Sequence, residues 1–231
     1  MKRVYKQVSV AAVDGGFEVR LDGRSLKSPA RAPLPLLTEA LAQAIAAEWD
    51  AQKDEVNPHS MPLMQLAATA IDRVSVQRDD MVNAVAAYAE TDLVCYWAES
   101  PAKLVERQAK VWQPLLDWAM LRYDARLEVC SGIMPTRQPA GALKALHHAV
   151  EAYDDMMLSA LQLATSTAGS LVVALALIER HIDSAAAFEV SQIDETFQIE
   201  EWGEDPEATR RRAGLKGDME AARRFADLLR A

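Results

Sequence analysis

The residues best able to do chemistry form an acidic segment at positions 193–205, IDETFQIEEWGED. This segment contains six carboxylates and no basic residue, namely Asp194, Glu195, Glu200, Glu201, Glu204 and Asp205. Two nearby carboxylates can act as general acid and general base if burial separates their pKa values. Glu195 with Asp194, or Glu200 with Glu201, would then serve a carboxylate-dependent hydrolase, which is one interpretation of the segment.

A protein-binding surface is the alternative, and the aromatic residues of the segment favour it. Like charges three or four positions apart destabilise a helix, and no Lys or Arg lies between Arg180 and Arg210. We therefore expect compensation from outside the helix, for which a basic partner surface is one candidate and a solvated acidic face another. Apolar residues on more than one side fit a binding surface better than a plain polar face. The predicted partner-binding residues are Asp194, Glu195, Phe197, Glu200, Glu201 and Trp202.

Motifs for other kinds of site are missing from the chain. The sequence has no GxxxxGK[ST], no GxGxxG and no GxSxG, so we expect no phosphate-binding loop and no esterase-type nucleophile. The four histidines lack metal-ligand spacing, and Cys95 and Cys130 belong to no CxxC or Cys/His cluster. The sequence therefore predicts no catalytic residue, no cofactor and no metal, and hence a protein that is not an enzyme.

Composition narrows the class of protein further. The 231 residues carry a net charge of −9, which argues against general nucleic-acid binding. Alanine is abundant and only 9 glycines occur, a composition that favours helices. Two cysteines in a chain of this size are typical of reduced thiols in a reducing compartment.

The elements that position the acidic segment begin with strands. Apolar and polar residues alternate over 4–10 and again over 17–21, and Asp14-Gly15-Gly16 and Asp22-Gly23 supply turns between extended segments. A proline-rich stretch follows at 29–35. These patterns predict a small antiparallel β unit over roughly the first 37 residues.

Helical periodicity replaces this alternation from Thr38, a predicted N-cap. Further helices are predicted from Pro62, from Asp79-Asp80, from Ser100-Pro101 with the serine as cap, from Pro139 and from Asp218. Pro114 is expected to kink or restart its helix, and one helical pattern extends from Asp183 to Trp202. Residues 127–133 fit a strand or an extended connector.

The predicted architecture is α+β, a small antiparallel β-rich N-terminal domain followed by a larger all-helical C-terminal domain. Asn57-Pro58 is the best boundary. It divides the chain into a β-rich domain with one helix at 1–58 and a helical domain at 59–231.

One uncharged stretch, Met156 to Ile178, is long enough to cross a bilayer. Its centre contains Gln162 and the polar or small run 165–170, where a membrane helix should be most apolar. We therefore expect two buried helices that break near 167–170 and no stable membrane insertion, with a membrane-associated protein as the alternative.

Several blocks of sequence resemble one family. They are GFEVRLDGRSLKSP, AIAAEWDAQ at 44–52, MPLMQLAATAIDRV at 61–74, TDLVCYWAESPAKLVERQ at 91–108, GSLVVALAL at 169–177 and the acidic segment. Their combination and order resemble the assembly chaperone of the F-type ATP synthase that handles the alpha subunit, found in mitochondria and alphaproteobacteria. The resemblance covers nearly the whole chain.

The resemblance implies a chaperone without catalytic activity or a nucleotide requirement. Such a protein would bind the free alpha subunit, shield the surface that later packs on the beta subunit, and promote assembly of the alpha/beta hexamer. We expect a monomer. The N-terminus MKRVYKQVSV lacks an Arg/Ser-rich transit segment, which favours the bacterial cytoplasm, with the mitochondrial matrix as the alternative for a processed eukaryotic homologue.

Overall fold

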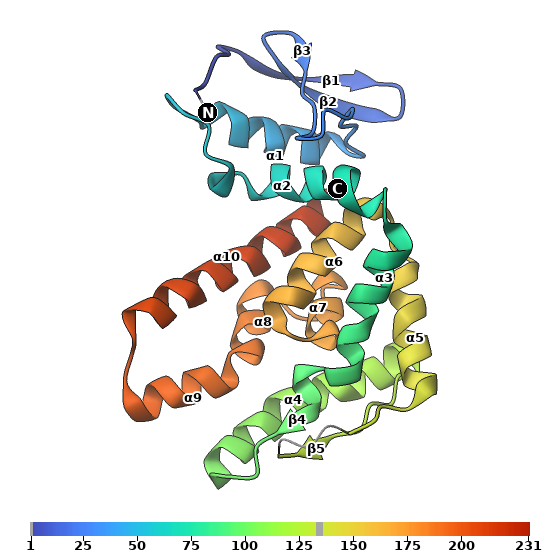
Figure 1. Ribbon diagram of the computed structural model, residues 1–231, viewed down its shortest axis with the longest axis vertical. Helices are drawn as coiled ribbons and strands as arrows, with labels where there is room; N and C mark the ends of the chain where they lie inside the picture. Colours follow the sequence, from blue (N-terminus) through green and yellow to red (C-terminus); the bar gives the residue numbers. More distant parts are fainter. Residues whose placement is uncertain (1, 133–135) are drawn as a thin grey trace. The chain divides into compact units, whose positions relative to one another are not determined.

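The computed structural model describes residues 2–132 and 136–231, which form two compact units (Figure 1). The first unit comprises Met1–Arg78, Asp154–Ala160 and Ala221–Ala231, and the second comprises Asp79–Tyr153 and Leu161–Glu220. Strands followed by many helices confirm the predicted α+β class. The predicted domain boundary at residue 58 stays a prediction.

The first unit starts with the predicted antiparallel sheet. Strands β1 (Val8–Val13), β2 (Gly16–Leu21) and β3 (Arg24–Ser25) pair in the order β1-β2-β3, with Val10 opposite Val19. Asp22 and Gly23 both have positive φ, at 49° and 78°. Two such residues make the tight turn whose twist suits a hairpin. The Asp22-Gly23 pair therefore predicted the turn between β2 and β3 correctly.

Helices complete the first unit, and Thr38 caps the first of them as predicted. Its hydroxyl accepts from Leu41 N at 3.2 Å and donates to Leu228 O at 2.6 Å, so one side chain ties the start of α1 to the chain's C-terminal region. Leu41 and Ile45 of α1 are fully buried. The helical segments that follow are α1 (Glu39–Asp50), η1 (Pro58–Ser60), α2 (Pro62–Thr69) and the π-helical turn η2 (Ala70–Val74).

The second unit is built mainly from helices, with one short parallel strand pair. Tyr96 of β4 pairs with Cys130 of β5, so part of the stretch 127–133 is a strand; Ile133 lies outside the described residues. The elements of the rest of the chain are α3 (Arg78–Ala86), η3 (Ala87–Thr91), η4 (Leu93–Cys95), β4 (Tyr96–Trp97), α4 (Ala102–Tyr123), β5 (Cys130–Ser131), α5 (Ala140–Glu151), α6 (Asp155–Ala168), α7 (Leu171–Ile178), α8 (Ser184–Ser191), α9 (Ile193–Trp202) and α10 (Pro206–Leu228).

The uncharged stretch forms two helices with a break, as predicted. Gly169 has φ of 66° between α6 and α7, and the Ser170 hydroxyl accepts from Val173 N at 3.0 Å to start α7. All eight residues of α7 are buried, so its apolar composition is explained by its position in the protein core. Among the described residues, no helix combines the length and hydropathy that crossing a bilayer would need.

Three local predictions were wrong, and a fourth was wrong in part. Ser100 does not cap α4, whose N-cap position is held by Pro101. Pro114 does not restart that helix, which runs unbroken over 22 residues, and the alternative of a kink at Pro114 stays a prediction. The helical pattern from 183 to 202 is two helices separated at Gln192. The last helix begins at Pro206, because the Asp205 carboxylate accepts from Ala208 N at 3.0 Å and supplies a cap.

Candidate functional site

Helix α9 carries the acidic segment, and its apolar residues hold it in the second unit. Ile193 and Phe197 are buried, and α9 packs against α4. Lys103 and Arg107 both lie over the Phe197 ring, each 5.7 Å from its centroid. These two bases are four residues apart and therefore share one face of α4. Phe197, a predicted partner-binding residue, is thus an internal anchor with only 6% of its surface exposed.

Each carboxylate on α9 faces a donor or a cation from another helix. Asp194 accepts from Gln108 Nε2 at 2.6 Å, and Glu195 pairs with Arg211 at 2.5 Å. The remaining two pairs join α9 to α4: both Glu200 oxygens accept from Arg107, at 2.9 and 2.7 Å, and Glu201 lies 3.8 Å from Lys103. The structure therefore brings all four predicted acids together with partners inside the chain.

These pairs change the explanation of why α9 can be so acidic. The sequence predicts compensation from outside the helix, and α4 and α10 provide it within the same unit. The hydrogen bond from Arg107 lowers the pKa of Glu200 below its usual value. No local sequence signal placed these bases, because Arg107 and Glu200 are 93 residues apart; only the spacing of Lys103 and Arg107 hinted at a basic face.

The end of α9 differs from its body. Trp202 exposes 79% of its surface, and Gly203 follows with φ of 92°. Glu204 is exposed and forms no ion pair with any residue in the described ranges. An exposed indole beside a carboxylate without a cationic partner is therefore the part of the acidic segment left free for another molecule.

Asp92 is a second, buried acidic centre that the sequence did not single out. Its carboxylate accepts from Val172 N at 3.0 Å and from Val94 N at 3.3 Å, so it joins the start of α7 to η4. The side chain is fully buried. Burial raises the pKa of Asp92 to about 6, against the opposing effect of hydrogen bonds from Ser170 and the backbone.

Local contacts and burial describe the surroundings of three histidines and of Cys95. His147 Nε2 lies 3.0 Å from Asn83 Oδ1, the His181 ring stacks on Trp118 with 4.9 Å between ring centroids, and His148 is exposed. Cys95 is buried, and its desolvation raises the pKa of its thiol above the usual range. Within 2–132 and 136–231, no group of three His, Cys, Asp or Glu side chains is arranged to hold a metal ion.

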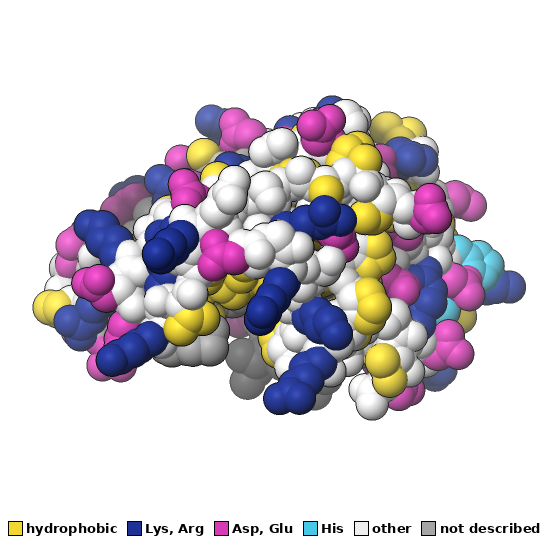
Figure 2. Space-filling model, turned by 90° about the horizontal axis from the view of Figure 1, so that it is seen from above, with side chains coloured by type: hydrophobic (Ala, Val, Ile, Leu, Met, Phe, Trp, Pro, Cys, Tyr) yellow, Lys and Arg dark blue, Asp and Glu magenta, His cyan; other side chains and the backbone are white. Residues whose placement is uncertain are grey.

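Charge is mixed over the molecular surface, in spite of the net charge of −9. Figure 2 shows Lys and Arg side chains among Asp and Glu side chains on one face, with small hydrophobic areas between them. The net negative charge therefore does not make that face uniformly acidic. Local features such as Trp202 are thus better indicators of a binding surface than the net charge.

The family model described as ATP12 chaperone protein matches residues 2–120. The chain belongs to the ATP12 chaperone family. It is 24% identical over 214 residues to Protein atp12, mitochondrial, of the fission yeast Schizosaccharomyces pombe, covering 87% of this chain and 74% of that protein. The family membership predicted from the sequence blocks is confirmed.

Two solved structures agree closely with this fold. The crystal structure of Atp12 from Paracoccus denitrificans has a TM-score of 0.94 and 39% identity, covering 99% of this chain and 98% of that one. A point mutant of P. denitrificans Atp12p has the same TM-score of 0.94 at 38% identity, covering 99% and 97%. The chain is thus an ATP12-family chaperone, which supports a role in assembly of the ATP synthase.

Proposed function

We propose that this chaperone binds the free alpha subunit of the F-type ATP synthase and covers the surface that later packs on the beta subunit. Family membership supports the assembly role, and the sequence blocks resemble the member that handles alpha. An unassembled subunit exposes apolar interface, which is an aggregation hazard. Covering that surface reversibly requires binding and no chemical conversion.

Trp202 is the observation that carries this proposal. An indole that is 79% exposed at the end of a well-packed helix does little for the fold, whereas tryptophan is among the residues that dominate binding energies at interfaces. Glu201 and Glu204 on either side of it are exposed and would form a charged rim. Trp202 and Glu201 are therefore the primary contact residues in this account.

The other predicted partner-binding residues take a positioning role in the proposal. Asp194, Glu195 and Glu200 hold α9 against α4 and α10, and Phe197 anchors it to the second unit. Their substitution is expected to weaken client binding by moving Trp202. The exposed atoms of these ion pairs can also contact the client directly in the same arrangement.

The absence of catalysis is part of the proposal, and the hydrolase alternative loses support from α9. A general acid needs a carboxyl whose pKa is raised toward neutrality. Arg107 instead lowers the pKa of Glu200, so this carboxylate stays ionised and cannot donate a proton near neutral pH. We further propose that the protein acts as a monomer in the bacterial cytoplasm, without nucleotide.

A pull-down from cells that make ATP synthase tests the proposal. Tagged protein is expected to retain unassembled alpha subunit without beta. Trp202→Ala should weaken the affinity for alpha about thirtyfold and so lower the amount retained, since a central interface tryptophan contributes roughly 2 kcal/mol. Circular dichroism should stay unchanged because the indole is largely solvent-exposed.

Leu121→Ala is the matched control, because Leu121 is another exposed large apolar residue, at 82%, in the same unit. This variant should retain alpha as the wild type does. Equal retention by all three proteins would remove Trp202 from the contact surface. Retention of beta instead of alpha, or of neither, would contradict the proposed client.

A further inference from the structure

The two edges of the sheet in the first unit differ in how they are protected. The strand order β1-β2-β3 places β1 at one edge and β3 at the other. An edge strand presents unpaired backbone N–H and C=O groups, to which another extended chain can bind. Proteins usually prevent such pairing with short edge strands, lysine, proline or a bulge. An edge without these devices is therefore a candidate binding surface.

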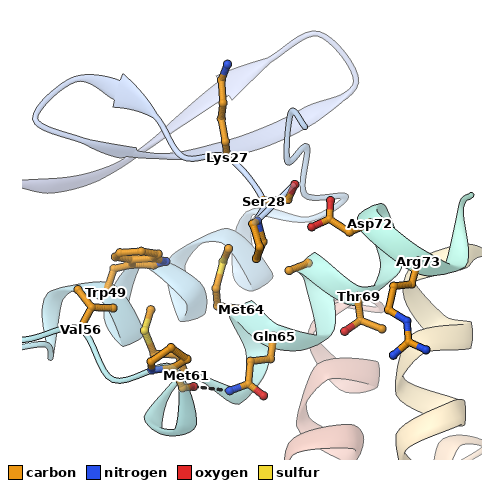
Figure 3. Close-up of a pocket in the computed structure, with 13 residues that line it drawn as sticks. Lys27, Ser28, Trp49, Val56, Met61, Met64, Gln65, Thr69, Asp72 and Arg73 are labelled. Carbon is orange, nitrogen blue, oxygen red and sulfur yellow. Dashed lines mark hydrogen bonds between the residues drawn. The ribbon is translucent and has the colours of Figure 1, made fainter. Parts of the chain in front are cut away.

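The β3 edge has several of these devices. The strand is only two residues long, and Lys27 after it forms an isolated bridge with Pro33. Figure 3 shows the Lys27 side chain with its charged end directed away from the pocket beside α1 and α2. A short strand followed by a lysine and by proline offers little backbone for an incoming chain, so this edge is protected.

The β1 edge has none of them. Its six residues, VSVAAV, include no charge and no proline. The strand pairs with β2 residue by residue, from Val8 opposite Leu21 to Val13 opposite Gly16, so it contains no bulge. Apart from β2, no segment of the described residues pairs with β1 in a sheet. β1 is therefore a regular and uncharged edge strand.

The register shows which backbone groups of β1 point outward. Phe17 of β2 exchanges both of its backbone hydrogen bonds with Leu36, at 2.9 and 2.8 Å, on the side of β2 that faces away from β1. Ala12 lies opposite Phe17. Residues opposite each other in an antiparallel pair either exchange both bonds or direct both sets of groups away from each other. The N–H and C=O groups of Ala12, Val10 and Val8 therefore point out of the sheet, without a backbone partner in the described part of the chain.

The side chains at this edge leave room for a further strand. Helix α1 packs against β1 and β2 (Figure 1), and Val19 on that face of β2 is only 1% exposed. Val10 is opposite Val19 and Val8 is on the same face, but both are only half-buried, and Ala12 is exposed. An added strand with apolar residues on this face would extend the apolar layer between the sheet and α1.

We propose that β1 pairs with an extended, uncharged segment of a client polypeptide, which adds a strand to the sheet. A row of alternating N–H and C=O groups is complementary to another extended backbone. The source is a client because the chain belongs to a chaperone family. An uncharged segment fits best, since a charge buried against the apolar residues of β1 would lose hydration without gaining a partner. Identification of the client as the alpha subunit rests on the proposed function, whereas strand pairing rests on the edge itself.

Amide hydrogen exchange of the full-length protein, followed by NMR, tests the pairing residue by residue. In the free protein, the amides of Val8, Val10 and Ala12 should exchange much faster than those of Ser9 and Ala11, which face β2. The probes are twelve-residue peptides with uncharged apolar centres, taken from the alpha subunit and from an unrelated β-rich protein. Saturating peptide should slow exchange of the outward amides at least tenfold and leave the inward amides unchanged.

Two results of this experiment would overturn the proposal. One is unchanged exchange of the outward amides with every peptide. The other is slower exchange that develops with rising protein concentration and no peptide, because this would assign the edge to a second copy of the chain.

Two N-methylated versions of the tightest-binding peptide test the geometry. Neighbouring residues of a strand direct their N–H groups to opposite sides. A methyl group on one residue therefore removes a hydrogen bond to β1, whereas a methyl group on the next residue does not. The first version should bind about tenfold more weakly than the second, because it leaves an acceptor of β1 unpaired. Equal affinities would contradict strand pairing.

Ala12→Pro blocks the same edge from the side of the protein. Ala12 is exposed and its N–H points outward, and proline is tolerated in an edge strand at such a position. Peptide affinity should fall about tenfold. Val4→Pro, at a residue that is 87% exposed and precedes the strand, is the matched control and should leave affinity unchanged. Unchanged affinity in Ala12→Pro, with the inward amides still protected, would contradict the proposal.

Intact alpha subunit distinguishes the edge from the proposed client. Slower exchange of the outward amides with peptides, but no capture of intact alpha, would support the edge and overturn the client. Capture of alpha without slower exchange at Val8, Val10 and Ala12 would support the client and overturn the edge.

Discussion

The carboxylates of α9 and the carboxylate of Asp92 are held in opposite ways within the same unit. Those on α9 lie at the surface and face side-chain donors, and Arg107 lowers the pKa of Glu200. Asp92 is fully buried, accepts only from neutral donors, and its pKa is raised to about 6. Cationic partners thus stabilise the ionised carboxylates of a surface helix. Burial instead raises the free energy of ionising Asp92, and its buried hydrogen bonds make this residue hard to replace.

The acidic segment contains residues that attach α9 to its own unit and residues proposed to bind the client. Three of the four acids on α9, namely Asp194, Glu195 and Glu200, attach it to α4 and α10. Glu201, Trp202 and Glu204 are exposed at and just beyond the end of the helix, and they are the residues proposed to contact the client.

Asp92→Ala should have the largest effect on stability. It removes the acceptor of two backbone N–H groups in the core, at Val94 and Val172. Buried donors left without acceptors cost roughly 1–3 kcal/mol each, so the free energy of unfolding should fall by about 3 kcal/mol. Urea unfolding at pH 7 measures this change, and a loss below the error of the method would contradict the structural role of Asp92.

The pH dependence of Asp92 should follow from its raised pKa. Because the pKa in the folded state, about 6, lies above the ordinary value of 3.8, this contribution to stability is complete below about 3.8 and is lost as pH rises through 6. As pH falls from 7 to 4, the free energy of unfolding of the wild type should therefore rise by up to about 3 kcal/mol relative to that of Asp92→Asn. Urea unfolding of both proteins across this pH range measures the difference in their free energies of unfolding. A difference that stays constant with pH would contradict the raised pKa of Asp92.

Charge reversal on α9 should separate two neighbouring acids. Glu201→Lys disturbs only a long contact with exposed Lys103, so it should weaken capture of the alpha subunit about threefold and leave the melting temperature unchanged. Glu200→Lys puts an ammonium group against Arg107 and should lower both capture and melting temperature. If the two reversals behaved alike in both measurements, the division between holding and binding residues would be wrong.

Arg107→Ala should have the smallest effect. Loss of its hydrogen bonds should raise the pKa of Glu200 toward the usual value, with only a slight change in melting temperature because the pair is exposed. Carboxyl ¹³C chemical shifts followed against pH report the pKa directly. Lys110→Ala, on an exposed position of the same helix, is the control and should leave the Glu200 titration unaffected.

Local patterns were enough to predict much of the fold. Alternation identified the β1–β2 hairpin, Asp22-Gly23 its neighbouring turn and Thr38 the cap of α1, because each depends on a few adjacent residues. The break at Gln192 has no glycine or proline to mark it. The start of α10 was missed because Asp205 was counted with the acidic segment, although Asp205-Pro206 is a helix-start signal.

The candidate site depended far more on contacts between distant residues. Trp202 was predicted to bind a partner, and 79% of its surface is exposed, whereas its role in binding stays a prediction. The partners of Glu200 and Glu195 come from α4 and α10, which only tertiary packing brings to α9.

Mixing the purified chain with isolated alpha subunit, and separately with isolated beta subunit, tests the central claim most directly. Size-exclusion chromatography with light scattering measures the mass of any complex. The account predicts a complex of one chain with one alpha subunit, weakened about thirtyfold in Trp202→Ala, and no complex with beta. A stable complex with beta, or none with alpha, would contradict it.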